Sequence, residues 1–277
     1  MTKVGIIGSA GWVGKSMKNL FPEAICYDKN NPECIAWQTS LLGADGKPKI
    51  EQRAIDMRDI NTCSIAFICV PSPCPDKGAL DTSIVEEVVK ECKCPLIVIR
   101  STVNPGTCDE LSKKYKKNIV MQPEYVGETP RHPLLDEKQT PFIIMGGKPE
   151  DCRKLIELYT TVYNANVTIR QMTALEAEIV KLSENRAIGF KVAQCQELYD
   201  VCEKAGVDYY NIREAVYGDD PRFNLWWTFI FPDKRGFNSK CIPKDIYAWA
   251  AWAESVKVEP VLTNAMLKYN AKLIGEK

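Results

Sequence analysis

The feature that most constrains the fold is a series of short apolar runs spread over the first 170 residues. The runs read VGIIG, AICYD, IAFICV, LIVIR, NIVMQ, FIIMGG and NVTIRQ. They are rich in β-branched residues, and segments long enough for a helix separate them. Strands of this kind are typical of parallel sheets that helices cover on both faces. We therefore predict an α/β domain with a doubly wound parallel sheet in residues 1–172.

The pattern changes at Thr173. The sequence TALE offers an N-cap threonine with Glu176 three residues later, a capping box, and a helical sequence without proline then runs to Gly206. At about 1.5 Å per residue this helix is on the order of 50 Å long, longer than most helices within one compact domain. We predict that it leaves the sheet domain and forms the centre of an all-helical domain, residues 173–277. A short helical segment near residues 209–217 and two amphipathic helices, near residues 243–256 and 260–274, follow it.

The first strand leads into a glycine loop, Gly8-Ser-Ala-Gly11-Trp-Val-Gly14, which opens a predicted helix. Glycines there let the backbone turn tightly and approach a pyrophosphate, whose charge the helix N-terminus favours. The spacing is one residue longer than the usual GxGxxG, and such a turn also occurs without a ligand.

Asp28 ends the second strand, twenty residues after Gly8. A carboxylate there accepts hydrogen bonds from an adenosine ribose and repels a 2′-phosphate, whereas the plain alternative is an aspartate that caps a helix. Together with the glycine loop, Asp28 predicts NAD rather than NADP as the cofactor, although the neighbouring Lys29 softens that preference.

The composition argues against several classes of function. Thirty-six basic residues balance thirty-six acidic ones, so no global field favours nucleic acid or an anionic membrane. No run approaches the roughly 18 apolar residues of a membrane span, and the N-terminus is too rich in glycine for a signal peptide. Twelve cysteines without a secretion signal indicate free thiols in a reducing compartment, so we expect a cytoplasmic protein. One histidine and no CxxC motif argue against a zinc site, so no metal is expected.

One cysteine stands apart from the others. Cys241 lies in the polar turn RGFNSKCIPKD, between Lys240 and Lys244 and just before a predicted helix. Nearby positive charge and a helix N-terminus favour the thiolate form of a cysteine. Cys241 is therefore a candidate nucleophile.

Five stretches of the chain, in the same order, resemble the nucleotide-sugar dehydrogenases of the UDP-glucose/GDP-mannose 6-dehydrogenase family. They are FICVPSPCP (67–75), IRSTVNPGT (99–107), QPEYVGE (122–128), EAEIVKLSENRAIGFKVAQCQEL (176–198) and GFNSKCIPKD (236–245). The resemblance implies a Rossmann-like NAD-binding domain followed by a helical central domain for dimerisation and substrate binding. It also implies a role in polysaccharide biosynthesis and a homodimer through the long helix 173–205.

The resemblance also implies a reaction. Members of this family oxidise the C6 alcohol of a nucleotide sugar, such as UDP-glucose, to the carboxylate in two NAD-dependent steps. After the first hydride leaves, a cysteine thiolate traps the aldehyde as a thiohemiacetal; the second hydride converts it to a thioester, which water hydrolyses. Cys241 matches that cysteine.

Further residues match family positions. Lys181 and Asn185 are four residues apart and so share one helix face; they resemble the pair that orients the C6 oxygen and stabilises oxyanions. Asp245, Glu128 and Thr102 resemble the groups that orient or deprotonate water. The plain alternatives are a solvated helix face for the pair and a helix cap for Asp245. Glu124 is likewise a family position.

Contacts to NAD are expected from residues of the glycine loop and of the ends of the following strands, namely Gly8, Gly11, Trp12, Val13, Gly14, Asp28, Val70, Pro71, Ser101 and Thr102. The aromatic run before Cys241, with Trp226, Trp227, Phe229 and Phe231, lies where the family places residues around the sugar and base. A core or interface role for these aromatic residues is the alternative.

The chain departs from the family pattern in three places. The cysteine loop reads GFNSKC where the family usually has roughly GFGGSC, which puts the identity of the sugar and base in doubt. The glycine loop is longer by one residue. Family members usually continue into a third, nucleotide-binding domain, whereas this sequence ends at Lys277. Four alternatives stay open for a two-domain form: a smaller substrate, a partner chain that completes the site, completion by the other subunit of a dimer built on the long helix, or loss of catalysis.

Two other functions stay open. One is a two-electron hydroxyacid dehydrogenase, which would need no cysteine. The other is a non-catalytic protein that binds NAD or a nucleotide sugar.

Overall fold

The computed structural model describes residues 2–31, 35–42, 48–127 and 132–276, and for residues 35–42 and 48–52 it describes the backbone only. The chain forms two compact units. The sheet unit comprises residues 1–72 and 82–178, and the helical unit comprises residues 73–81 and 179–277. The domain boundary at Thr173 stays a prediction; the helical unit also takes the short segment 73–81 from the middle of the first predicted domain.

The sheet unit contains a seven-stranded sheet in the order β2-β1-β5-β6-β7-β8-β9. Its strands are β1 (Val4–Ile7), β2 (Ile25–Tyr27), β5 (Ile65–Ile68), β6 (Leu96–Ile99), β7 (Ile119–Met121), β8 (Phe142–Gly146) and β9 (Thr168–Met172). Each predicted apolar run overlaps one of these strands, and the α/β fold class is confirmed. The sheet is mostly rather than wholly parallel, because β8 pairs antiparallel with β7 and β9 follows the direction of β8.

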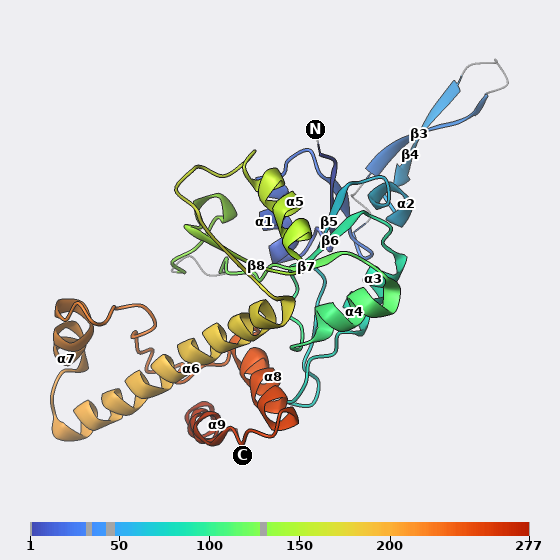
Figure 1. Cartoon of the computed structure of the whole chain (residues 1–277). Coiled ribbons are helices and arrows are strands. Elements are labelled where there is room, and N and C mark those ends of the chain that lie inside the picture. The colour runs from blue at the N-terminus through green and yellow to red at the C-terminus, as the bar shows by residue number, and fades with distance from the viewer. Residues whose placement is uncertain (1, 32–34, 43–47, 128–131, 277) are drawn as a thin grey trace. The chain divides into compact units, whose positions relative to one another are not determined.

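Alternate residues of the strands face two separate cores. Ile6 and Phe67 contribute to one core, with α1 (Trp12–Leu20) and α5 (Pro149–Tyr159). Ile7 and Ile68 contribute to the other core. The helices on that face are α2 (Met57–Ile60), α3 (Ser83–Glu91) and α4 (Thr107–Tyr115). Since side chains alternate along a strand, an almost continuously apolar strand buries both of its faces, and Figure 1 shows the helices that cover them.

An antiparallel hairpin was not predicted. β3 (Ile35–Leu42) pairs with β4 (Pro48–Ala54), apart from the seven-stranded sheet (Figure 1). The sequences IAWQTSLL and PKIEQRA contain few consecutive apolar residues, so a search for buried strands passes over them.

The helical unit is built on α6 (Ala174–Ala205), whose 32 residues span about 48 Å. The predicted capping box is present: the Glu176 N–H donates to Thr173 Oγ1 over 3.2 Å, and the Thr173 N–H donates to Glu176 Oε2 over 2.8 Å. Satisfying these end groups of the backbone fixes where the helix begins.

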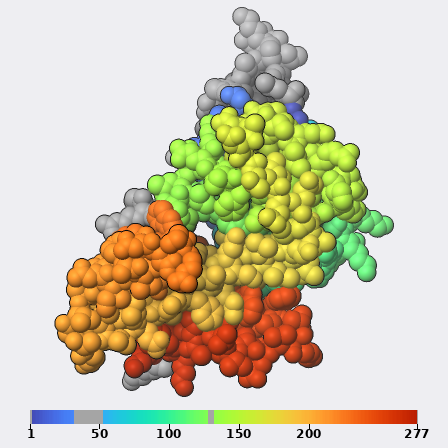
Figure 2. Space-filling view, turned by 60° about the vertical axis from the view of Figure 1, so that its left-hand side comes forward, coloured from blue at the N-terminus to red at the C-terminus, as the bar shows by residue number. Residues whose placement is uncertain are grey.

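Two groups of segments pack on α6. Towards its C-terminal end lie α7 (Tyr209–Arg213), a π-helical turn η2 (Glu214–Asp219) and the residues that follow, around the buried Cys195, Tyr209 and Ile230. Figure 2 shows this part of the chain in orange against the end of α6.

α8 (Ile242–Ser255) and α9 (Val261–Ile274) form the second group, with a core that contains Phe237, Ile246 and Met266. Gly189 of α6 permits this close packing, because a Cβ atom there would lie 2.5 Å from Ile246 Cδ1. The long helix and both amphipathic helices are thus confirmed. No helix in the described ranges is long and apolar enough to cross a membrane.

Candidate functional site

The predicted cofactor residues lie at one edge of the sheet. Strands β2, β1, β5, β6 and β7 are successive parallel neighbours, so their carboxyl ends share an edge. Residues that follow these ends are Asp28, the glycine loop 8–14, Val70 with Pro71, and Ser101 with Thr102. The strand order reverses at β1, with β2 on one side and β5 on the other, and ligands of open α/β sheets bind at such a point.

The three glycines of the loop have different reasons for being glycine. Gly8 has φ of 82°, and a Cβ atom there would lie 2.6 Å from the Cys69 carbonyl oxygen. A Cβ atom at Gly14 would lie 2.2 Å from the Gly8 carbonyl oxygen. At Gly11 the nearest atom would be 3.4 Å away, an ordinary contact, and the residue is exposed. Packing therefore requires glycine at positions 8 and 14 only, and a ligand that approaches the backbone gives a reason for Gly11.

Asp28 accepts a hydrogen bond from the glycine loop and still has acceptor positions for a ligand. One carboxylate oxygen accepts the Ala10 N–H over 3.0 Å, and the other accepts the Asn30 N–H over 3.0 Å. A carboxylate offers about four acceptor positions, so two remain for the hydroxyls of a ribose. With the N-terminus of α1 beside them, where the first N–H groups have no acceptor within the helix, these residues fit NAD.

Ser101 joins two of the strand ends. Its hydroxyl donates to the Val70 carbonyl oxygen over 2.6 Å, and the side chain is buried. Ser101 and Val70 thus fix the shape of the carboxyl edge between β5 and β6. Trp12 of the loop is by contrast exposed at the start of α1.

In the helical unit, two predicted catalytic residues meet where α6 and α8 pack together. Asn185 Nδ2 on α6 donates to Asp245 Oδ2 over 2.5 Å, and Lys244 Nζ donates to Asp245 Oδ1 over 2.5 Å. Asp245 is 1% exposed, and a buried carboxylate requires such donors. Lys181 lies one helical turn before Asn185 and is half-buried.

Cys241 immediately precedes α8. Of the eleven described cysteines nine are buried, Cys74 is partly buried and Cys241 is exposed. Burial raises the pKa of the Cys63 and Cys152 thiols, the latter to about 11, so they stay protonated at neutral pH. Lys244, one of the two lysines expected to favour the Cys241 thiolate, has its ammonium group on Asp245. Among the described cysteines, Cys241 is the thiol most open to solvent or to a substrate.

Both units match domains of a known protein family. The NAD binding domain of the UDP-glucose/GDP-mannose dehydrogenase family matches residues 47–167, and the central domain of that family matches residues 175–272. The chain belongs to the UDP-glucose/GDP-mannose dehydrogenase family. Its first domain is thus the NAD-binding domain of the family, which agrees with the cofactor predicted from Asp28.

Curated relatives extend over more residues than this chain. The chain is 27% identical over 288 residues to the UDP-glucose 6-dehydrogenase of Rickettsia prowazekii, with 96% of this chain and 64% of that protein covered. It is 26% identical over 226 residues to the UDP-glucose 6-dehydrogenase of Rickettsia typhi, with 76% of this chain and 50% of that protein covered. The chain therefore spans between half and two thirds of the length of these family members.

Solved structures share the fold. A UDP-glucose dehydrogenase from the hyperthermophilic archaeon Pyrobaculum islandicum has a TM-score of 0.78 at 22% identity, over 98% of this chain and 68% of that one. A GDP-mannose dehydrogenase from Pseudomonas aeruginosa has a TM-score of 0.65 at 22% identity, over 98% of this chain and 69% of that one. The chain thus has a fold that these solved dehydrogenases share.

Two carboxylates predicted from the family pattern follow β7. Glu128 lies outside the described residues. Glu124 is buried: one oxygen accepts from Arg100 Nη2 over 2.7 Å, and the other accepts the Val126 N–H. Arg100 Nη2 also donates to Glu137 Oε1 over 2.7 Å. In this cluster Glu124 holds Arg100 and the backbone after β7, and its catalytic role stays a prediction.

Sequence reasoning missed Arg100 and Glu137. Arg100 is 1% exposed, and burial raises the pKa of Glu137 although Arg100 opposes that rise. The available signal was the arginine that ends the apolar run LIVIR, because a buried arginine needs carboxylate partners.

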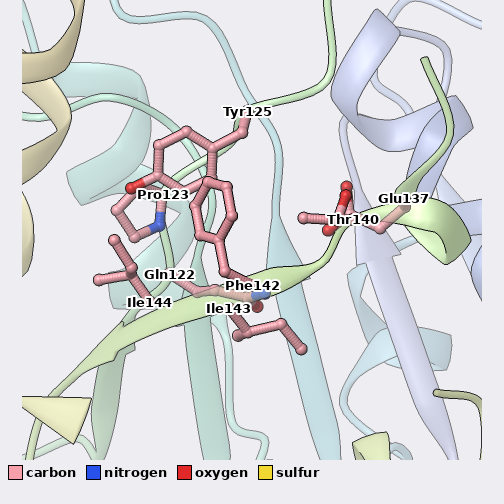
Figure 3. Close-up of a pocket in the computed structure, with 8 residues that line it drawn as sticks. All are labelled: Gln122, Pro123, Tyr125, Glu137, Thr140, Phe142, Ile143 and Ile144. Atoms are coloured by element: carbon pink, nitrogen blue, oxygen red, sulfur yellow. The ribbon is translucent and has the colours of Figure 1, made fainter. Parts of the chain in front are cut away.

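A small cavity adjoins this ion cluster. Its lining comes from Gln122, Pro123, Tyr125, Glu137, Thr140 and residues 142–144. Figure 3 shows the rings of Tyr125 and Phe142 close together. Their centroids are 5.0 Å apart, and the ring planes are tilted by 54°. The cavity measures about 10 Å³, about enough for one water molecule. It is too small for a cofactor or a sugar.

A larger cavity of about 220 Å³ lies within the helical unit. Residues of three segments surround it, 74–77, 237–247 and 267–276. They include Asn238, Ser239 and Lys240, the positions at which the cysteine loop departs from the usual glycines of the family.

Asn270 of α9, also missed, fixes the base of the cysteine loop. Its side chain accepts the Phe237 N–H over 2.8 Å and donates to the Phe237 carbonyl oxygen over 2.9 Å. The signal for this role in the sequence was a polar residue on the buried face of α9, which Thr263 and Met266 share. Because both backbone groups of Phe237 are held, the residues that follow it start from a fixed position.

The aromatic run alternates in exposure. Trp226, Phe229 and Phe231 are exposed, whereas Thr228 and Ile230 between them are buried. The three exposed rings therefore do not belong to the core, which leaves the predicted ligand contact or an interface as their role.

Proposed function

We propose that the protein oxidises the C6 alcohol of a nucleotide sugar to the carboxylate, in two NAD-dependent steps that pass through a thioester on Cys241. The observation that carries this proposal is the exposure of Cys241 at the start of α8, while nine other thiols are buried. The contact between Asn185 and Asp245 in the same unit supports it, because both residues belong to the matched central domain.

In this proposal the carboxyl edge of the sheet holds the cofactor. Gly11 and the first turn of α1 receive the pyrophosphate, and the free acceptor positions of Asp28 receive the ribose. NAD, when bound, accepts the hydrides that leave the sugar carbon.

The helical unit supplies the nucleophile and the groups around the reacting oxygen. The Cys241 thiolate attacks C6 of the aldehyde, so that a carbon–sulfur bond forms and the carbonyl oxygen becomes an oxyanion. Asn185 has one N–H on Asp245 and therefore keeps a second N–H for that oxygen. Lys181, one turn away on the same helix face, supplies positive charge.

Hydrolysis of the thioester releases the product. Water adds to the carbonyl carbon, the carbon–sulfur bond breaks, and the thiolate of Cys241 is regenerated. We assign the orientation of this water to Thr102 and Glu128 on the strength of the family pattern. Asp245, whose two oxygens hold Asn185 and Lys244, acts as a positioning residue for Asn185.

Native thiol labelling tests the proposal. We expect iodoacetamide to modify Cys241 first, with NADH formation from UDP-glucose, GDP-mannose or an N-acetylhexosamine analogue lost in proportion to that modification. The nucleotide sugar that is oxidised should protect the thiol. Cys241→Ser is the control, since it removes the reactive group with little change in volume.

The other outcomes separate the alternatives. Labelling of Cys241 without loss of NADH formation would favour the two-electron dehydrogenase. Binding of NAD with no NADH from any of these sugars would favour the non-catalytic protein. The homodimer through residues 173–205 and the cytoplasmic location stay predictions, and sedimentation velocity of the purified chain would test the former.

A further inference from the structure

We propose that the cavity beside the cysteine loop binds the diphosphate group of the nucleotide sugar, with Lys240 and Lys77 as its phosphate-binding residues. That the anion is a diphosphate rests on the proposed function. The cavity itself, about 220 Å³, lies wholly in the helical unit.

The lining of this cavity has the chemistry of an anion site. Among the described residues, three lysines, Lys77, Lys240 and Lys244, line it together with a single carboxylate, Glu276. Asn238, Ser239, Tyr247 and Asn270 add neutral polar groups. Ammonium groups bind phosphate as strong charge-assisted donors, and amide and hydroxyl groups complete the coordination of the remaining oxygens.

Lys240 is the cation that the cavity leaves available. Its side chain is exposed, and within the described part of the chain it makes no ion pair or hydrogen bond. Lys244 differs, because its ammonium group lies 2.5 Å from Asp245 Oδ1. Within the described residues, an anion that binds Lys240 therefore competes with no carboxylate for it.

Lys77 is held by an ion pair that a ligand can exchange. Its ammonium group lies 2.5 Å from Glu276 Oε2, and the two side chains are 59% and 42% exposed. Exposed ion pairs contribute little, so replacing Glu276 by a phosphate costs little. In the absence of a ligand, Glu276 competes for the same lysine.

The wall that carries Lys240 is fixed at its base. Asn270 holds both backbone groups of Phe237, and a Cβ atom at Gly236 would lie 2.5 Å from Asn270 Oδ1. The site is thus partly preorganised, which lowers the entropy lost on binding.

The position of the cavity suits a substrate that reacts at Cys241. The diphosphate of a nucleotide sugar is attached at C1, and the sugar ring separates C1 from the reacting C6. A diphosphate site should therefore lie near the thiol without including it. Lys240 precedes Cys241 directly, and Cys241 is absent from the cavity lining.

Calorimetric titration of the full chain with inorganic pyrophosphate, UDP and GDP, without NAD, tests the proposal. Lys240→Met should weaken binding about tenfold, the loss expected for one charge-assisted hydrogen bond. Lys240→Arg should keep most of the affinity. Lys234→Met is the matched control: Lys234 is exposed on the same loop but does not line the cavity, so its loss should leave binding unchanged.

Glu276→Gln provides a change of opposite sign. It releases Lys77 and removes the one negative charge of the lining, so pyrophosphate should bind more tightly, by roughly threefold or more. A merely structural role for Glu276 predicts no gain. Lys77→Met should weaken binding, and by less than Lys240→Met, because Lys77 must first leave Glu276.

Three results would overturn the inference: no binding of pyrophosphate, UDP or GDP by the wild type, unchanged binding in Lys240→Met, or an equal loss in Lys234→Met. NADH assays distinguish a failure of the diphosphate site from a failure of the proposed enzymatic function. Oxidation of a nucleotide sugar with pyrophosphate binding insensitive to Lys240 would refute the diphosphate site alone. Lys240-dependent binding without oxidation of any nucleotide sugar would leave an anion site and refute the enzyme.

Discussion

Two buried carboxylates, one in each unit, were predicted as site residues, and their surroundings differ. Glu124 in the sheet unit pairs with Arg100, whose side chain is 1% exposed. Asp245 in the helical unit pairs with Lys244, whose side chain is 21% exposed and lines the larger cavity. Both carboxylates are themselves buried. The two clusters differ in the exposure of the cation that pairs with the carboxylate.

The exposure of the paired cation determines how easily each cluster can exchange that cation. Arg100 is enclosed with two carboxylates, and removing it would leave buried charges unpaired. Lys244 reaches solvent, so the Asp245 cluster can exchange this donor for water or a ligand at smaller cost. Burial of the carboxylate alone does not distinguish the two cases.

The largest expected effect is that of Arg100→Met. It leaves Glu124 and Glu137 buried without their cation, so we expect the free energy of unfolding to fall by about 3–5 kcal/mol. Chemical denaturation measures this. Arg58→Met is the control, because Arg58 is exposed and its pair with Asp56 lies at the surface. A small loss of stability in Arg100→Met would show that the Glu124 and Asp245 clusters are alike.

The same variant should depend on pH. Burial already holds the pKa of Glu137 above its usual value. A carboxyl whose pKa is higher in the folded than in the unfolded state favours the fold at low pH, and this contribution is lost as the pH rises through the folded pKa. Without Arg100 that pKa rises further. The stability gap between variant and wild type should therefore narrow as the pH falls toward about 4.

A second contrast lies within the glycine loop. Gly14→Ala places a Cβ atom 2.2 Å from a carbonyl oxygen, and we expect it to destabilise the protein by about 3 kcal/mol. Gly11→Ala meets only an ordinary contact, so stability should change by less than about 1 kcal/mol while NAD binds roughly tenfold more weakly. Thermal unfolding and NAD titration check both variants. Equal stability of the two variants would mean that close packing does not determine the conformation of the glycine loop.

Asn270→Ala should have an intermediate effect, in the helical unit. It leaves two buried backbone groups of Phe237 without their partners, and we expect a loss of about 2 kcal/mol. Because the cysteine loop loses its anchor, the labelling rate of Cys241 should also change. Asn264→Ala, an exposed asparagine on the same helix, should alter neither quantity.

Of the two carboxylate clusters, that of Asp245 should show the smaller effect on stability, in Lys244→Met. Asp245 keeps the Asn185 amide, and water reaches the position of the lost ammonium group, so the loss should be about 1 kcal/mol. A loss as large as that of Arg100→Met would contradict the comparison. Lys244→Arg should restore stability, because it returns a cation to Asp245.

Much of the fold was predictable because apolar pattern and capping act locally. The seven strands and the start of α6 at Thr173 followed from runs of a few residues and from a single capping box. The direction of β8 did not follow from such local patterns, because the direction of a strand depends on the segment that connects it to the preceding strand. Residues 122–141 contain a single 3₁₀ turn, η1 (Glu137–Gln139), among their described members rather than a crossover helix, and β8 returns antiparallel.

The candidate site was predictable in its parts and less so in its partners. Cys241, Asn185 and Asp245 stood out by residue type and family pattern. The side chains that hold them did not, since the contact of Asn270 with Phe237 joins residues 33 apart and depends on how α9 packs. The segment 73–81, which brings Lys77 to the cavity, likewise joins the helical unit through tertiary packing of Leu80 against Leu182.

The most direct measurement is the number of NADH molecules formed per nucleotide sugar consumed, for the wild type and Cys241→Ala in parallel. The account predicts two NADH per sugar for the wild type, and one or none for the variant. One NADH per sugar in the wild type, unchanged in Cys241→Ala, would contradict the role of the cysteine.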